Sequence, residues 1–244
     1  MIDINISGLV KSFDLEKKIL DGVTFKIDSG ERVGLLGKNG SGKSTLTALL
    51  LRLYDADQGV VWVGGMDVKA QDRRALQSRF GVVFQSDDLI RGTVYENISF
   101  LRNLPRPAVE AAARTAQAWP FISQLPQGLD TPLDPGGANL SGGQRQRLLI
   151  ARALADRPEI LVLDNADSAL DYSTAAALRQ ALRRDFPCTT LVIISERVSA
   201  VREADCILVL ENGRIDAQGC HDALMASCRR YQRMAKLQMG GDVG

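Results

Sequence analysis

The chain has 244 residues, 45% of them hydrophobic, and its 30 Lys and Arg residues nearly balance 29 Asp and Glu residues. This length fits one large domain or two lobes that share a core. The formal charge of +1 argues against a nucleic-acid-binding surface. No apolar run reaches the roughly 18 residues of a membrane span. The N-terminus lacks a signal-peptide pattern, and the four cysteines include no C-x-x-C pair, so we expect a soluble cytosolic domain with free thiols.

The chain opens with strand patterns. Alternate positions of residues 2–28 are apolar in two stretches, at Ile2, Ile4 and Ile6 and at Val23, Phe25 and Ile27. This alternation predicts a half-exposed antiparallel sheet. Arg32–Leu36 follows as a short apolar strand.

The next stretch, Leu36–Thr45, matches G-x-x-x-x-G-K-[ST], the pattern of a loop that cradles phosphates between a strand and a helix. Its glycines let successive N–H groups point at one anion at the start of the helix. Lys43 would reach the β- and γ-phosphates of a nucleotide, and the Ser44 hydroxyl would bind Mg²⁺. The alternative is a glycine-rich turn that binds nothing, which a lysine and two hydroxyl residues in register disfavour.

Further apolar strands are predicted at Val60–Val63 and Phe80–Phe84. From about Asp87 to Ala155, helical segments interrupted by prolines predict an inserted helical lobe. Near its end comes the segment Leu140-Ser141-Gly142-Gly143-Gln144. Ser141 is a natural N-cap, and the two glycines expose the first N–H groups of the next helix. The segment is therefore either a second anion site or a plainly capped helix.

Parallel-sheet patterns return after this lobe, at Ile160–Leu163, Thr190–Ile194 and Cys206–Leu210. The helical segment Thr174–Arg184 separates the first two strands, which is the rhythm of a covered parallel sheet. Asp164 ends the first strand and either holds Mg²⁺ through water or caps the next turn. The tail His221–Gln238 is predicted to be helical, and residues 240–244 are predicted to fray.

Three features of the chain, in their order and spacing, resemble the nucleotide-binding domain of an ATP-binding cassette (ABC) transporter. They are the phosphate-binding loop Leu36–Thr45 (the P-loop), the L-S-G-G-Q segment Leu140–Gln144 and the strand-ending Asp164. The resemblance covers essentially the whole chain. It implies an α/β fold: a P-loop NTPase core with a parallel sheet, an N-terminal antiparallel β subdomain and an inserted α-helical subdomain. We expect a single domain over residues 1–240, with core and β subdomain at about 1–86 and 156–240 and the helical subdomain at about 87–155.

The resemblance also implies site residues. Phe13 falls where the family stacks an aromatic ring on adenine, and Gln85 falls where a glutamine joins the two lobes and reaches Mg²⁺. The expected ATP-binding residues are Phe13, Gly37, Lys38, Asn39, Gly40, Ser41, Gly42, Lys43, Ser44, Thr45 and Gln85. The expected Mg²⁺ ligands are Ser44, Gln85 and Asp164. The loop that crosses to a partner domain is matched by Ser168, Ala169, Leu170 and Asp171.

Partners are implied as well. Two such domains would meet head to tail, each ATP closed between one P-loop and the other chain's signature, Leu140–Gln144. The segments Leu125–Thr131 and Arg145–Arg147 look more like those of exporters than of importers. Ser86–Phe100 would contact a transmembrane domain, unless it is an ordinary lobe-packing segment. The chain would then lie at the cytoplasmic face of a membrane, its spans either removed from a longer protein or on another chain.

Two positions depart from the family pattern. Asn165 stands where a glutamate polarises the attacking water, and Glu196 stands where a histidine senses the γ-phosphate. An amide cannot accept the water's proton, and a carboxylate repels the γ-phosphate. We therefore expect Mg²⁺-ATP binding with little hydrolysis, as in the degenerate site of a heterodimeric exporter whose partner has an intact Glu and His. The alternatives are a homodimeric ABC ATPase domain and a soluble ATP-gated ABC clamp with no membrane role.

Overall fold

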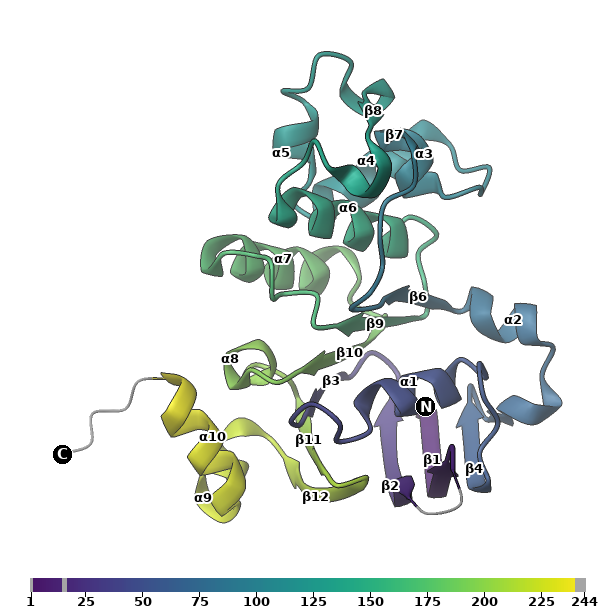
Figure 1. The fold of residues 1–244 in the computed structure, drawn as a ribbon, viewed down its shortest axis with the longest axis vertical. Helices are drawn as coiled ribbons and strands as arrows, with labels where there is room; N and C mark the ends of the chain where they lie inside the picture. Colours follow the sequence, from purple (N-terminus) through teal and green to yellow (C-terminus); the bar gives the residue numbers. More distant parts are fainter. Residues whose placement is uncertain (1, 15–16, 240–244) are drawn as a thin grey trace. The chain divides into compact units, whose positions relative to one another are not determined.

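The computed structural model describes residues 2–14 and 17–239, so the predicted fraying of residues 240–244 lies outside the described residues. The chain forms two compact units, one of residues up to Arg79 together with those from Thr190 onward, and one of Phe80–Thr189 (Figure 1). Both units combine helices with strands, and both contain parallel strand pairs. The predicted α/β fold class is therefore confirmed.

The first unit contains an antiparallel sheet. Its strand order is β2-β1-β4-β5, formed by β1 (Ile2–Ser12), β2 (Lys18–Asp28), β4 (Gln58–Val63) and β5 (Met66–Asp67). Val23, Phe25 and Ile27 of β2 are buried, whereas the residues between them are exposed. One face of the sheet thus packs on the core, as the alternation of the sequence predicts.

A second sheet of the first unit carries the phosphate loop. In the order β12-β11-β3-β10 it contains β3 (Arg32–Leu36), β10 (Thr190–Ser195), β11 (Cys206–Glu211) and β12 (Arg214–Gly219). β3 pairs in parallel with β10 and β11, and β12 is antiparallel to β11. Leu36 pairs with Ser195. The carboxyl ends of β3 and β10 therefore share one edge, where open α/β sheets bind ligands.

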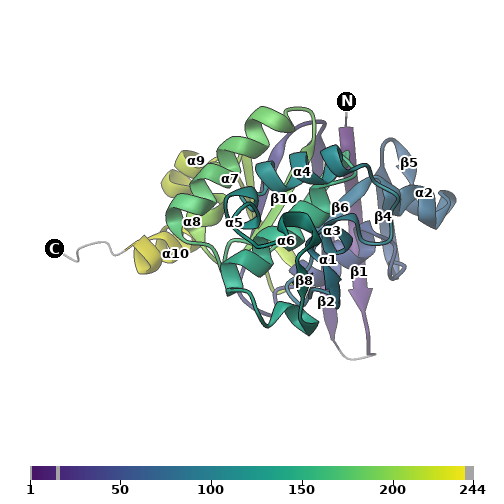
Figure 2. The ribbon, with the colours of Figure 1, turned by 90° about the horizontal axis from the view of Figure 1, so that it is seen from above.

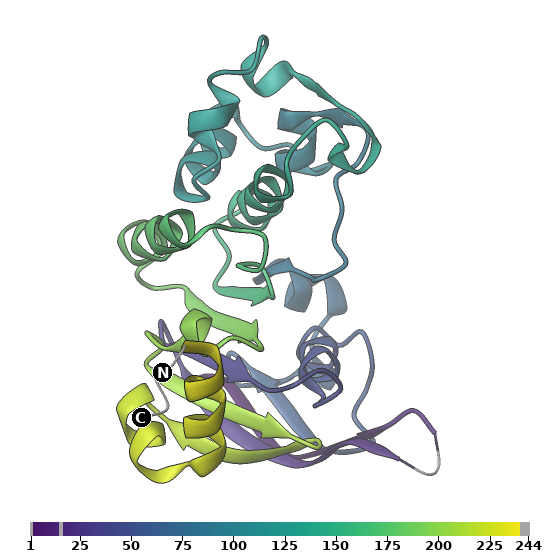
Figure 3. The same cartoon turned by 60° about the vertical axis from the view of Figure 1, so that its left-hand side comes forward.

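Helices complete the first unit. They are α1 (Lys43–Leu50), α2 (Arg73–Ser78), α8 (Val198–Val201), α9 (His221–Ser227) and α10 (Arg229–Met239), with a 3₁₀ turn η1 (Val68–Ala70). The tail forms two helices where one helical segment was predicted, because Cys228 between them has an extended backbone. Tyr231 and Ala235 of α10 pack with Val198 and Val201 of α8 in one buried cluster. Figure 3 shows the C-terminal helices α9 and α10 in yellow.

Replacing Tyr231 by Phe is expected to change how stability depends on alkaline pH. The Tyr231 side chain is fully buried, and its hydroxyl lies 2.8 Å from Nδ1 of His221. Burial raises the pKa of Tyr231 to about 12, whereas a phenol in the unfolded chain ionises near about 10. The free energy of unfolding should hold below about pH 10 and fall as pH rises toward about 12. Denaturant titrations across this pH window should show a smaller decline in the free energy of unfolding for Tyr231→Phe than for the wild type. Equal declines in the two proteins would contradict the raised pKa of Tyr231.

The second unit pairs two parallel strands with a helical group. The strands are β6 (Phe80–Val83) and β9 (Ile160–Asp164), and the helices are α3 (Val94–Ser99), α4 (Arg106–Thr115), α5 (Trp119–Ile122), α6 (Gly142–Leu154) and α7 (Tyr172–Asp185). Helix α4 packs against α3, α5, α6 and α7 (Figure 2). A small unpredicted sheet joins β7 (Gly92–Thr93) to β8 (Pro132–Leu133), and 3₁₀ turns occur at η2 (Gly128–Asp130) and η3 (Pro135–Gly137). Among the described residues, no helix is both long and apolar enough to cross a membrane.

Candidate functional site

The glycine-rich loop lies between β3 and α1, where the sequence places it. Gly42 is the N-cap of α1, with φ of 107°, and within the described part of the chain no side chain caps this helix. A Cβ at Gly42 would lie 2.9 Å from the Ile19 carbonyl oxygen, and one at Gly37 would lie 2.5 Å from that of Leu210. Both positions therefore require glycine. The first N–H groups of α1, left without a side-chain cap, carry the positive end of the helix dipole and suit an anion.

Two side chains of this loop are buried and polar. Lys43 donates from Nζ to the carbonyl oxygens of Gly37 and Lys38, each at 2.8 Å, and is only 6% exposed. Ser41 Oγ is buried and has no hydrogen-bond partner among the residues that the structure describes. A buried ammonium beside an uncapped helix start and an unpartnered hydroxyl favours an anionic ligand. Lys38, Asn39, Gly40 and Ser44 are exposed, and Thr45 is half-buried.

The turn that follows β10 adjoins this loop. Gly37 donates from its backbone N to the Ser195 carbonyl oxygen at 3.4 Å, and Glu196 comes next, half-buried. Within the first unit, Ser195 therefore contacts the P-loop directly through its main chain, and Glu196 is the next residue. This turn therefore carries a residue with a carboxylate, and a carboxylate close to a polyphosphate repels it.

Phe13 is an exposed aromatic residue in the same unit. Phe13 is 57% exposed, and its ring meets the ring of Tyr54, a residue that is 52% exposed, edge to face at 5.1 Å. Exposed aromatic faces of this kind can stack on a nucleotide base. The family resemblance predicts Phe13 as an adenine-stacking residue, but the sequence gives no signal for its contact with Tyr54, which belongs to no motif and lies 41 positions further along the chain.

The second unit brings Gln85 and Asn165 together. Asn165 Nδ2 donates to Gln85 Oε1 at 3.2 Å. Asn165 has φ of 51°, in the left-handed region that asparagine tolerates better than most residues. Asp164, just before it, ends β9 and is 3% exposed. The amide of Asn165 thus lies in hydrogen-bond contact with the glutamine that sequence reasoning assigned to Mg²⁺.

The signature segment forms the start of α6. Ser141 Oγ accepts from the backbone N of Gln144 at 3.2 Å, and Gln144 Oε1 accepts from the backbone N of Ser141 at 2.9 Å. This reciprocal capping box confirms Ser141 as the predicted N-cap. A Cβ at Gly142 would have no neighbour within 4 Å. The helix start is therefore open to solvent at Gly142 in the described part of the chain.

Replacing Ser141 by Ala is expected to destabilise the chain by about 1 kcal/mol, because the first turn of α6 would lose its cap. Ser123→Ala is the matched control, since the Ser123 hydroxyl donates to the Pro120 carbonyl oxygen on the surface and caps no helix start. Urea denaturation of both variants measures the difference. A loss for Ser123→Ala as large as that for Ser141→Ala would show that the capping box contributes nothing special.

The loop Ser168–Asp171 leads into α7, and its last residue caps that helix. Asp171 accepts hydrogen bonds from the side chains of Ser173 and Thr174 and from the backbone N of Thr174. These bonds hold the pKa of Asp171 well below its usual range. Asp171 is therefore the N-cap of α7, and Ser168 and Ala169 are exposed before it.

The residues that could hold a metal ion are few. Among the described residues, no group of three or more His, Cys, Asp or Glu side chains could do so. Mg²⁺ usually keeps several waters and binds through one or two carboxylates together with substrate phosphates, so it does not need such a cage. Of the predicted Mg²⁺ ligands, Ser44 belongs to the first unit, and Gln85 and Asp164 belong to the second. Each side chain carries a hard oxygen donor of the kind that Mg²⁺ prefers.

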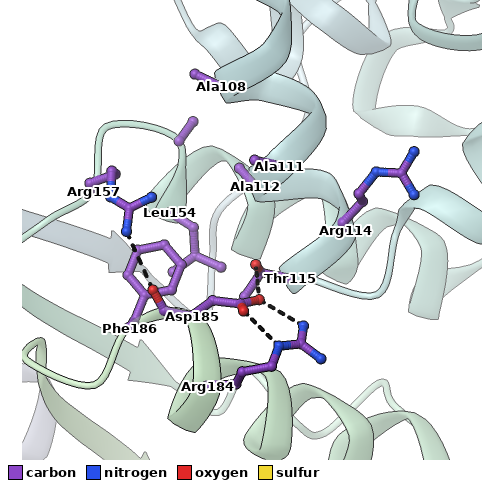
Figure 4. Close-up of a pocket in the computed structure, with 11 residues that line it drawn as sticks. Ala108, Ala111, Ala112, Arg114, Thr115, Leu154, Arg157, Arg184, Asp185 and Phe186 are labelled. Atoms are coloured by element: carbon purple, nitrogen blue, oxygen red, sulfur yellow. Dashed lines mark hydrogen bonds and ion pairs between the residues drawn. The ribbon is translucent and has the colours of Figure 1, made fainter.

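A separate pocket of about 480 Å³ lies in the second unit (Figure 4). Alanines of α4 line one side, and Asp185 and Phe186 at the end of α7 line the other. Asp185 pairs with Arg184 and accepts from the Thr115 hydroxyl at 2.8 Å, so Arg184 chiefly lowers the pKa of Asp185. None of the residues predicted for nucleotide binding lines this pocket.

A parallel-strand core with a glycine loop running into an uncapped helix defines a P-loop nucleotide-binding domain. Comparison with known families agrees, since the family described as ABC transporter matches residues 20–168. The chain belongs to the ABC transporter family, in which it corresponds to the nucleotide-binding domain.

Similar proteins include exporters. The chain is 40% identical over 242 residues to an ATP-dependent lipid A-core flippase of Aromatoleum aromaticum, covering 96% of the chain and 40% of that protein. It is 45% identical over 222 residues to the cyclolysin secretion/processing ATP-binding protein CyaB of Bordetella pertussis, covering 91% and 31%. A solved bacterial Atm1-family ABC exporter with ATP bound superimposes with a TM-score of 0.94 at 35% identity, covering 100% of this chain and 43% of that one. The chain thus spans less than half the length of these relatives.

Proposed function

We propose that this chain binds Mg²⁺-ATP for an ABC exporter, hydrolyses it slowly in its own site, and completes the active site of a second cassette. The P-loop would bind the phosphates, Phe13 the adenine, and Ser44, Gln85 and Asp164 the metal. One observation supports the proposal above all: the start of α1 has no side-chain cap, and the ammonium group of Lys43 is buried there. The P-loop before α1 also contacts the turn that contains Glu196. The predicted phosphate-binding residues and Glu196 belong to the same unit.

Slow hydrolysis follows from the chemistry at two positions. A general base typically contributes about 10²–10⁴ in rate, and Asn165 can orient a water but cannot take its proton. Glu196 cannot donate a hydrogen bond to a γ-phosphate as a histidine can. ATP would then remain bound as a long-lived clamp. Relatives named as a flippase and a secretion protein favour an exporter over a soluble clamp.

The contribution to a partner would come from α6. The helix start at Ser141–Gln144 is capped internally, yet Gly142 faces open space, so its N–H groups remain accessible to the nucleotide of a second cassette. We propose that Ser168–Asp171 contacts that partner and that Ser86–Phe100 contacts a transmembrane domain. The chain would then work at the cytoplasmic face of a membrane.

An experiment that mixes two variants of this chain tests whether the signature of one chain completes the nucleotide site of the other. A repaired chain carries Asn165→Glu and Glu196→His together with Gly142→Glu, which adds bulk and charge to the signature without an internal clash. Alone, this chain should release little phosphate from ATP, because no intact signature is present. Addition of the wild-type chain should restore turnover, and addition of a chain carrying only Gly142→Glu should not. Equal turnover with both additions would refute a role for the signature in the partner's site.

A further inference from the structure

The turn between β10 and α8 carries Glu196 but supplies no side-chain cap of its own. Helix α8 begins at Val198, and its N-cap residue Arg197 makes no side-chain capping bond. The backbone N of Arg197 donates to Ser195 Oγ at 3.0 Å. The next donor, the backbone N of Val198, is buried and would lack an acceptor within its own helix.

Gln238 of α10 provides the missing cap from 40 residues away. Its Oε1 accepts from the backbone N of Val198 at 2.7 Å, and its Nε2 donates to the Glu196 carbonyl oxygen at 2.7 Å. The reversed amide would set donor against donor and acceptor against acceptor, so only one orientation makes both bonds. One side chain therefore holds the main chain on both sides of Arg197.

The packing of α10 against α8 determines the position of Gln238. Tyr231 and Ala235 of α10 are 0% and 3% exposed and pack against Val198 and Val201 of α8. Gln238 follows these two residues at the helical spacing i, i+4 and i+7, and so lies on the same face of α10. The buried contacts fix the helix, and the helix presents the amide to the turn.

The opposite side of the turn is tied to the nucleotide loop, because Gly37 donates to the Ser195 carbonyl oxygen. The backbone of Glu196 is thus held between the P-loop and Gln238. Since a fixed backbone fixes the direction of Cα–Cβ, both contacts limit where the carboxylate can go.

We propose that Gln238 is a positioning residue that keeps the Glu196 carboxylate at the nucleotide site, so that the C-terminal helix α10 sets how strongly the site discriminates ADP from ATP. The inference rests on the proposed function. A held carboxylate repels the γ-phosphate, which ATP has and ADP lacks, and therefore lowers the affinity for ATP more than for ADP. When the contacts of Gln238 with the turn are removed, the affinity for ATP should therefore rise relative to the affinity for ADP.

The test compares Gln238→Ala with Gln232→Ala. Gln232 lies on the same helix and donates its amide to the Met225 carbonyl oxygen at 2.7 Å, away from the turn. In the full chain, Gln238→Ala should raise the ratio of ATP to ADP affinity, measured by calorimetric titration, by about twofold to tenfold. The amide of Val198 should exchange its hydrogen faster by a similar factor, and Gln232→Ala should change neither quantity.

Two further variants separate positioning from general damage. Gln238→Glu keeps the acceptor for Val198 but loses the donor to Glu196, so the affinity ratio should shift while Val198 stays protected. In a Glu196→Ala background, Gln238→Ala should leave the ratio unchanged, because the effect acts through the carboxylate. An unchanged ratio in Gln238→Ala, or an equal shift in both backgrounds, would overturn the inference while ATP binding by the wild type stands. A wild-type chain that binds neither nucleotide would instead overturn the proposed function, and this inference with it.

Discussion

ATP turnover is expected to rise by about 10²–10⁴-fold when Asn165→Glu and Glu196→His are combined in one chain. The glutamate restores a carboxylate that can take a proton from the attacking water, and the histidine replaces a repelling charge by a hydrogen-bond donor. The gain is expected only if copies of this chain supply each other's signature, which the proposed role of Ser141–Gln144 implies. Steady-state phosphate release, followed as the protein concentration is raised, measures the gain.

Asn165→Gln with Glu196→His is the matched control. Glutamine has the length of glutamate but no basic oxygen, and either residue must adopt the left-handed backbone of position 165, with φ of 51°. That conformation costs both variants about 1–2 kcal/mol, so the difference between them reports the chemistry alone. Equal turnover by the two chains would show that the missing carboxylate does not limit hydrolysis.

Affinity for ATP is expected to fall by roughly 10- to 100-fold in Lys43→Ala, the range for losing a charged hydrogen bond. The Lys43 ammonium is buried and already held at the loop by two carbonyl oxygens, so little reorganisation is needed when phosphates bind. Titration calorimetry with Mg²⁺-ATP measures the loss.

Lys26→Ala serves as the control for Lys43→Ala, because Lys26 is an exposed lysine of β2 in the same unit. Thermal unfolding of both variants separates lost affinity from lost structure, since removal of Lys43 also frees the Gly37 and Lys38 carbonyls. Unchanged ATP affinity in a folded Lys43→Ala chain would place the phosphates elsewhere and contradict the proposed site.

Much of the fold follows from local patterns. The alternation in residues 2–28 predicts the antiparallel strands β1 and β2, and the apolar runs predict β3, β9, β10 and β11. Ser141 as the start of α6 follows from capping chemistry. These features depend on side-chain period and on hydrogen bonds between near neighbours, both of which can be seen in the sequence.

The glycine and lysine pattern of Leu36–Thr45 is a property of the sequence alone and predicts a nucleotide site. The expectation of impaired hydrolysis comes from the family resemblance, which implies the roles of positions 165 and 196, together with the chemical nature of Asn165 and Glu196. Only the tertiary structure decided that Tyr54 accompanies Phe13, that Asn165 bonds to Gln85 and that Gln238 caps α8 beside Glu196. The physical reason is distance along the chain: these pairs are 40 or more positions apart, and no local rule of propensity or capping reaches so far. Packing of the helices and strands brings them together, and packing depends on the whole chain at once.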